Sequence, residues 1–68
     1  MLAVTVNGAS HTLRATEATV AELLRELALE GKRVAVEKNG AIVPRSLHAA
    51  TTVRVGDTIE IVAAVGGG

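Results

Sequence analysis

The chain has 68 residues, enough for one small domain, and 49% of them are hydrophobic although none is aromatic. Seven Lys and Arg residues balance seven Asp and Glu residues, and this zero net charge argues against a general nucleic-acid binder. The lack of Cys excludes disulfide scaffolds and thiol catalysis, and no apolar run has the length of a membrane span. We therefore expect a cytoplasmic protein that binds neither nucleic acid nor membranes.

A β-hairpin is predicted at the start of the chain. Residues 2–6 alternate between larger apolar and smaller or polar side chains, as in a strand with one buried face. Asn7-Gly8 follows directly, and this pair favours a type I′ turn because both central positions need a positive φ. A return strand over residues 10–14 completes the hairpin, with Leu13 as its buried anchor.

One amphipathic helix is predicted in the middle of the chain. Thr19 and Glu22 have the spacing of a capping box, in which each side chain accepts a hydrogen bond from a backbone amide at the helix start. Gly31 suits the position after the helix, where a left-handed conformation ends it at little cost. The apolar stripe recurs at helical spacing and consists of Val20, Leu23, Leu24 and Leu27.

The second half of the chain predicts three more strands. A third strand begins at Val34, and Asn39-Gly40 repeats the hairpin signal before a short strand that Pro44 ends. Residues 46–50 are expected to form an irregular turn or a short 3₁₀ helix. Residues 58–62 are β-branched at most positions, so we expect this strand at the centre of the sheet.

The order strand, strand, helix, strand, strand, strand indicates a two-layer α+β domain, because one helix covers one face of one sheet. The crossover lets the first and last strands lie parallel as central neighbours, which is the β-grasp arrangement. A ferredoxin-like sheet is the alternative that the pattern leaves open. The helix stripe is expected to pack on the sheet face that carries Val4, Val6, Ile59 and Ile61.

Three glycines, Gly66, Gly67 and Gly68, follow the last strand. They are either a frayed end without a role, or a terminus without side chains that threads a narrow channel and presents its carboxylate to another enzyme. We divide the chain accordingly into a domain over residues 1–65 and a flexible tail over residues 66–68. His11 and His48 stand alone in the sequence, so we expect neither catalytic residues nor a metal site.

A possible docking surface lies on the sheet face turned away from the helix. Strand alternation places a set of side chains there that has no second layer to cover it. Ordinary surface hydrophobicity is the alternative explanation. The set comprises Ala3, Ala35, Glu60 and Val62.

Three segments of the chain together carry a family pattern. Residues 34–46 hold the Asn-Gly hairpin that leads to Val-Pro-Arg-Ser, residues 56–62 hold Gly-Asp-Thr-Ile-Glu-Ile-Val, and residues 65–68 hold Val-Gly-Gly-Gly. In this order they resemble the thiamin sulfur-carrier family, ThiS, over essentially the whole chain. The resemblance implies a β-grasp domain with a mixed sheet of four to five strands and one helix on one face.

The resemblance also implies a function. In the family, a ThiF-like enzyme uses ATP and magnesium to adenylate the C-terminal carboxylate, and a sulfur-relay protein then helps convert it to a thiocarboxylate. The thiocarboxylate gives its sulfur to a ThiG-like thiazole synthase, which builds the thiazole ring of thiamin. Carried onto this chain, Gly68 bears the sulfur and Gly66 and Gly67 form the tether. The chain is then a protein cosubstrate and not an enzyme, and it binds no cofactor itself.

Two departures from related sequences matter. Leu47-His48 stands where many relatives carry an aromatic residue, which puts in doubt any partner contact that relies on a ring there. Ala63-Ala64-Val65 stands where molybdopterin-type relatives tend to have Phe and Pro, which disfavours that reading. The alternatives left open are a sulfur carrier for another acceptor, such as molybdopterin or tRNA, and a ubiquitin-like protein modifier.

Overall fold

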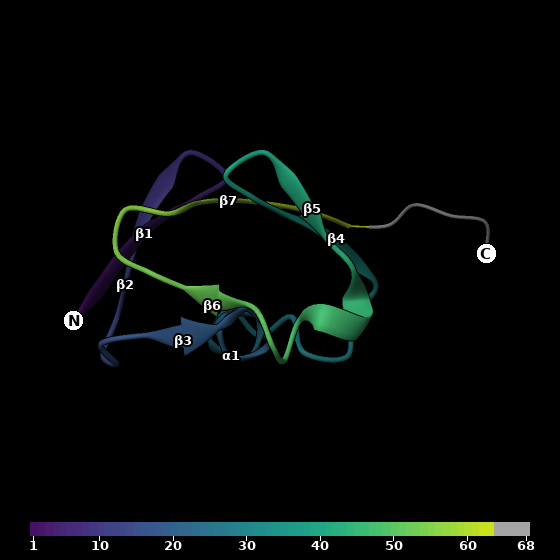
Figure 1. The fold of residues 1–68 in the computed structure, drawn as a ribbon, viewed down its shortest axis with the longest axis horizontal. Helices are drawn as coiled ribbons and strands as arrows, with labels where there is room; N and C mark the ends of the chain where they lie inside the picture. The colour runs from purple at the N-terminus through teal and green to yellow at the C-terminus, as the bar shows by residue number, and fades with distance from the viewer. Residues whose placement is uncertain (64–68) are drawn as a thin grey trace.

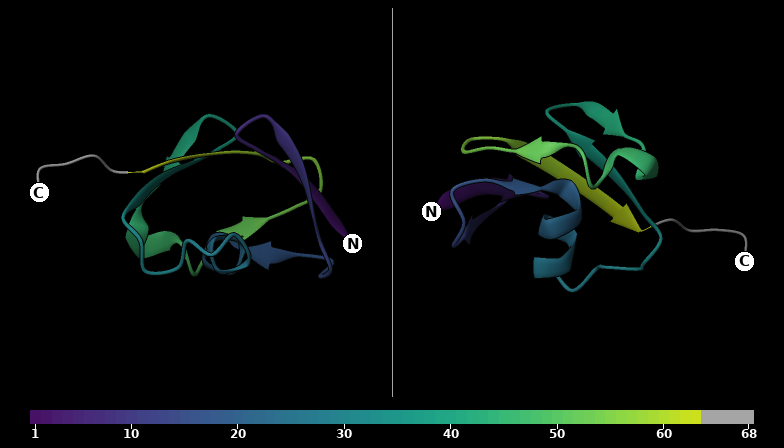
Figure 2. Two further views of the ribbon diagram at one scale, coloured as in Figure 1. Left: turned by 180° about the vertical axis from the view of Figure 1, so that it is seen from behind. Right: turned by 60° about the horizontal axis from the view of Figure 1, so that its bottom comes forward.

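The computed structural model describes residues 1–63, which form two layers (Figure 1). One layer is a mixed sheet in the order β2-β1-β7-β4-β5, and the other contains the helix α1 (Val20–Glu26) (Figure 2). Beside the helix, β3 (Ala18–Thr19) and β6 (Thr52–Val53) form a two-stranded sheet, and η1 (Arg45–Leu47) is a 3₁₀ helix. The strands of the main sheet are β1 (Leu2–Val6), β2 (Ala9–Leu13), β4 (Val34–Lys38), β5 (Ala41–Val43) and β7 (Thr58–Ala63).

The centre of the sheet confirms the β-grasp prediction. β1 and β7 are parallel neighbours, with Thr5 opposite Thr58 and Val6 opposite Ile59. Both predicted hairpins form, because Asn7-Gly8 and Asn39-Gly40 adopt the positive φ angles that a type I′ turn requires. The last strand is therefore held between the first strand and β4, which pairs with it antiparallel.

The core lies between the sheet and the helix, as the alternation predicted. Val4, Val6, Ile59 and Ile61 project from the sheet into one cluster with the helix stripe. In that stripe Val20, Leu23 and Leu24 are buried, and Leu27 packs against the cluster from a partly buried position. Among residues 1–63 no helix has the length and apolar character that crossing a membrane requires.

The start of the helix agrees with the sequence, but its end does not. Thr19 and Glu22 form the predicted capping box. The prediction that Gly31 follows the helix was wrong, because the helix ends a turn earlier. Ala28 takes the left-handed conformation, with φ of +60°, and its N–H donates to Arg25 O at 3.0 Å. Leu29 N donates to Leu24 O at 2.8 Å, completing a Schellman motif that turns Leu29 back against the core.

The small sheet of β3 and β6 was not predicted. Each strand has two residues, too few to show the alternation that identifies a strand in a sequence. Their pairing brings the segment before β6 over the helix start, where Val20 N donates to Thr51 O and Ala21 N donates to His48 O. Two helix amides that lack a partner within the helix are satisfied in this way.

Candidate functional site

The strand that leads to the glycine tail has a neighbouring strand on each side. β7 pairs with β4 over five residues, and its last residue, Ala63, lies opposite Val34. On its other side, Asn7 continues the short pairing with β1 through its side chain. Its Nδ2 donates to Ile61 O at 3.0 Å and its Oδ1 accepts from Ile61 N at 2.7 Å. The described part of the chain therefore ends in a strand that lies between two neighbours.

The predicted sulfur-bearing residue Gly68 and the tether residues Gly66 and Gly67 lie outside the described residues 1–63. The same holds for the predicted boundary between the domain and the tail, after residue 65. These assignments stay predictions.

The outer face of the sheet carries all four residues of the predicted docking surface, and all four are exposed. Ala35 and Val62 lie directly opposite each other, and Glu60 is two residues before Val62 on the same strand. Ala3 lies on the same face but at a distance from the other three residues. Its carbonyl accepts a hydrogen bond from the N–H of Gly56, which precedes β7 in the chain. The structure thus brings Ala35, Glu60 and Val62 together and leaves Ala3 toward the opposite end of β7.

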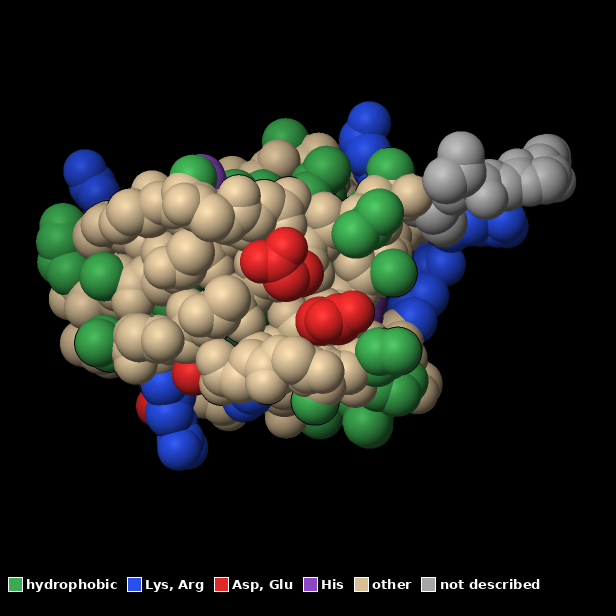
Figure 3. Space-filling model, turned by 90° about the horizontal axis from the view of Figure 1, so that it is seen from above, with side chains coloured by type: hydrophobic (Ala, Val, Ile, Leu, Met, Phe, Trp, Pro, Cys, Tyr) green, Lys and Arg blue, Asp and Glu red, His purple; other side chains and the backbone are tan. Residues whose placement is uncertain are grey.

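Two residues of this face were missed by the sequence analysis. Glu37 lies directly opposite Glu60, and Ile42, which is 75% exposed, lies opposite Glu37. Figure 3 looks onto this face and shows acidic groups side by side, with hydrophobic side chains nearby. The hairpin at Asn39-Gly40 indicates the pairing of Glu37 with Ile42. The pairing of Glu37 with Glu60 joins segments far apart in the chain and carries no local signal.

Asp57 fixes the turn that leads into β7. Its carboxylate accepts from Arg54 N at 2.8 Å and from Asn39 Nδ2 at 3.0 Å. Partial burial pushes the pKa of Asp57 upward. The two hydrogen bonds, together with the positive charges of Lys38 and Arg54, outweigh that effect and hold the pKa below its usual value of 3.8. The Asp57 carboxylate therefore stays ionised and supports the start of the strand.

His48, a lone histidine in the sequence, is the C-cap residue of η1 and is 9% exposed. Its Nε2 lies 3.1 Å from Val43 O, so the ring forms a hydrogen bond at the end of β5. Leu47, its neighbour, is a half-exposed side chain. His48 therefore holds the segment after β5 in place beside the helix.

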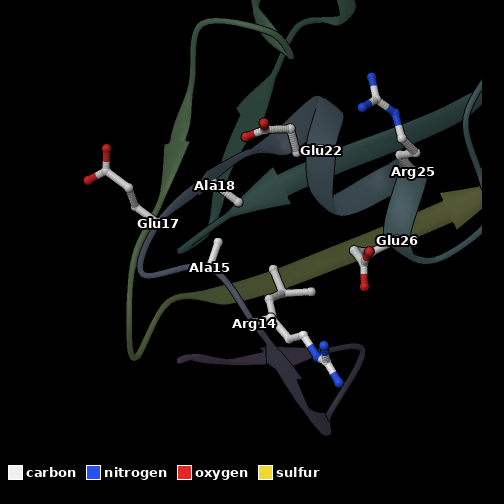
Figure 4. Close-up of a pocket in the computed structure, with 8 residues that line it drawn as sticks. Arg14, Ala15, Glu17, Ala18, Glu22, Arg25 and Glu26 are labelled. Carbon is white, nitrogen blue, oxygen red and sulfur yellow. The ribbon is translucent and has the colours of Figure 1, made fainter.

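A hollow next to the helix has a structural explanation. It lies between the end of β2, β3 and α1, and Figure 4 shows charged side chains of both signs around it. Glu22 belongs to the capping box, and Arg25 pairs with Glu30 at 3.2 Å. Two of the charged side chains around the hollow therefore already serve the helix region, and we place the functional site at the tail end of β7 and on the outer sheet face instead.

Comparisons with known proteins agree with this fold. The ThiS family model matches residues 3–68. A crystal structure of the thiamine biosynthesis protein ThiS from Geobacter metallireducens is 39% identical, with a TM-score of 0.86 over 98% of this chain and 100% of that one. A solution structure from the same organism, also 39% identical, has a TM-score of 0.79 and is covered to 88% of its length.

A longer protein contains a similar sequence. A thiazole synthase of Paramagnetospirillum magneticum is 46% identical over 63 residues, which are 93% of this chain. The chain spans only 19% of the length of that protein. Because the family model covers nearly the whole chain and the β-grasp sheet matches solved ThiS structures, the chain belongs to the ThiS family.

Proposed function

We propose that this chain is a sulfur carrier of thiamin biosynthesis whose working group is the carboxylate of Gly68. The observation that carries the proposal is the family match, which extends through the glycine tail to residue 68. The central position of β7 supports it, because the strand that precedes the tail in sequence lies between β1 and β4. The rest of the domain supplies a surface by which partners recognise that tail.

The proposed chemistry takes place on partner enzymes. A carboxylate is a poor electrophile, so a ThiF-like enzyme joins it to AMP from ATP, and pyrophosphate leaves. Sulfur at the oxidation level of sulfide, which a relay protein supplies, then attacks the acyl carbon, the bond from that carbon to AMP breaks, and AMP departs, which leaves a thiocarboxylate on Gly68. Glycine suits this position because it adds no side chain near the attacked carbon and accepts any backbone conformation that the partner imposes. ATP and magnesium are used by the partner enzyme, and the chain itself is a cosubstrate.

The acceptor we propose is a ThiG-like thiazole synthase. The similarity to part of a thiazole synthase supports this choice, since a sequence related to this chain is part of a longer protein that bears that name. The outer sheet face around Ala35, Glu60 and Val62 is the proposed docking surface for the adenylating enzyme. It is exposed, it lies on the strand that leads to the tail, and it combines apolar and acidic groups.

The test is sulfur loading of the purified chain. Incubation with ATP, the ThiF-like enzyme and a sulfur donor should raise the intact mass by the exchange of one oxygen for one sulfur, located in the C-terminal peptide. Deletion of Gly68, or one added residue after it, should abolish the change while the melting temperature stays the same. Gly67→Val should load poorly, because a β-branched side chain restricts the backbone beside the reacting carbon. Loading that survives the deletion, or that marks an internal residue, contradicts the proposal.

A further inference from the structure

Three basic residues gather at the end of the sheet where β7 finishes. Lys32 and Arg33 immediately precede Val34, the residue that pairs with Ala63. Arg45 begins η1, just after β5 has run alongside β4 toward the same end. Lys32 and Arg45 also line one hollow. Figure 3 shows Lys and Arg side chains at this end of the molecule. We call Lys32, Arg33 and Arg45 the basic cluster.

Within residues 1–63 the fold does not use these three charges. All three side chains are exposed, and the ion pair found in that part of the chain joins Arg25 to Glu30 instead. Lys38, in contrast, donates to Thr52 O at 2.8 Å and so serves the fold. Neighbouring like charges repel each other, so placing three of them at one end of the sheet carries an electrostatic cost.

The position of the cluster points to the partner. Ala63 and Gly68 are five residues apart, and five residues span at most about 18 Å. This distance is roughly twice the Debye length at physiological ionic strength, so a fully extended tail puts the reacting carboxylate beyond the reach of the cluster. The cluster instead meets whatever surface surrounds the opening into which the tail is inserted.

We propose that the basic cluster docks on a rim of Asp and Glu side chains around the tail channel of the adenylating enzyme. This inference rests on the proposed function, because it assumes that the tail enters that enzyme. Complementary charge at a channel mouth accelerates encounter and aligns the two proteins, and it does so without touching the reacting atoms. The cluster therefore acts on productive binding and leaves the chemical step unchanged.

The chain offers a matched control. Arg14 follows the end of β2, where Leu13 lies opposite Leu2, and Arg54 lies in the loop before β7. Both are exposed and both lie toward the start of β7, away from Ala63. The variants R33E/R45E and R14E/R54E change the net charge by the same amount. Because the positive charge of Arg54 also favours the ionised carboxylate of Asp57, the melting temperature of R14E/R54E is checked against that of wild type.

The experiment measures the ATP-dependent release of pyrophosphate by the ThiF-like enzyme at low and at physiological ionic strength. R33E/R45E should raise the KM for the carrier roughly 10-fold or more at low ionic strength while kcat is retained, and added salt should shrink the difference. R14E/R54E should stay within about 2-fold of wild type, because rim-distant charges contribute little to docking. Circular dichroism checks the fold, and R33Q/R45Q replaces the reversal variant if that one does not fold.

Several outcomes overturn the inference. Equal effects of the two double variants indicate a general charge effect, and no effect of R33E/R45E shows that the cluster does not dock. An effect on kcat alone places these residues near the chemistry instead. If R33E/R45E raises the KM for the carrier with thiazole synthase but not with the adenylating enzyme, the cluster docks on the synthase and the proposed partner is wrong. Failure of the wild-type chain to be adenylated at all contradicts the proposed function, and the two failures are therefore distinguishable.

Discussion

The side-chain amide of Asn7 replaces a backbone peptide group in the pairing of β1 with β7. It forms two hydrogen bonds with Ile61, at 3.0 Å from Nδ2 and 2.7 Å to Oδ1, so the parallel ladder continues past the last residue of β1. Asn7 also occupies a turn position with φ of +50°. One residue thus turns the first hairpin and holds the strand that leads to the tail.

Asn7→Gly is expected to lower the free energy of unfolding by about 1–3 kcal/mol, because the N–H and C=O of Ile61 lose their partners. Glycine adopts the positive φ without strain, so the loss reports the two hydrogen bonds and not the turn. Asn7→Ala should lower the free energy of unfolding further, since an alanine at this positive φ adds backbone strain. Urea unfolding measures both, and a Gly variant as stable as wild type contradicts the role of the amide.

Ala28→Gly is expected to stabilise the protein by about 0.5–1 kcal/mol. Ala28 holds φ of +60° at the end of the helix, a conformation in which a Cβ is strained and glycine is not. Ala21 lies in the first turn of the helix, where the same substitution should cost about 0.5–1 kcal/mol. Thermal unfolding of the two variants should therefore show shifts of opposite sign, and shifts of the same sign would refute the Schellman interpretation.

Glu60→Gln is expected to raise the free energy of unfolding by about 0.2–1 kcal/mol at low ionic strength, because it removes the repulsion from Glu37 directly opposite. Added salt should reduce the gain by screening the wild-type pair. Glu17, an exposed residue before β3, provides the control, and Glu17→Gln should leave stability unchanged. If Glu60→Gln gains stability but binds the adenylating enzyme less tightly, the acidic pair is kept for docking.

Asp57 is expected to make a contribution to the free energy of unfolding that depends on pH. The pKa of Asp57 is lower in the folded chain than its usual value of 3.8. The contribution is therefore complete above a pH of about 4 and is lost as the pH falls through the folded pKa. Asp57→Asn should melt at a lower temperature than wild type at neutral pH, and the difference should narrow in acid. A difference that stays constant down to the acid limit would show that charge is not involved.

Val62→Asp tests the outer sheet face. Val62 is 61% exposed, so the substitution should leave the fold and the circular dichroism spectrum unchanged. It should weaken binding to the adenylating enzyme, because it places a charge on the proposed docking surface. Val55 is 65% exposed in the loop before β7, and Val55→Asp is the control that should bind normally. Calorimetric titration compares the two, and equal affinities would move the docking surface elsewhere.

Local interactions explain what the sequence determined by itself. Each Asn-Gly pair encodes its turn through its own backbone preference, and Thr19 and Glu22 form the capping box within one helical turn. Alternation then identified the buried face of β1 and β7, because every second side chain of a strand points the same way. With the right-handed crossover, these signals favoured the β-grasp arrangement but left a ferredoxin-like sheet open, and the parallel pairing of β1 with β7 decided between the two.

Contacts between distant segments decided the rest. The helix ends at Glu26, with Leu27 as its C-cap, and the Schellman motif at Ala28 turns Leu29 against the core before Gly31 is reached. β3 and β6 exist only as a pair, and Glu37 faces Glu60 only because β4 lies beside β7. The basic cluster forms in the same way, since Arg45 joins Lys32 and Arg33 when β5 folds back along β4. A sequence pattern shows only the residues that are neighbours along the chain. These features depend instead on the free energy of contacts between segments that meet only in the folded chain.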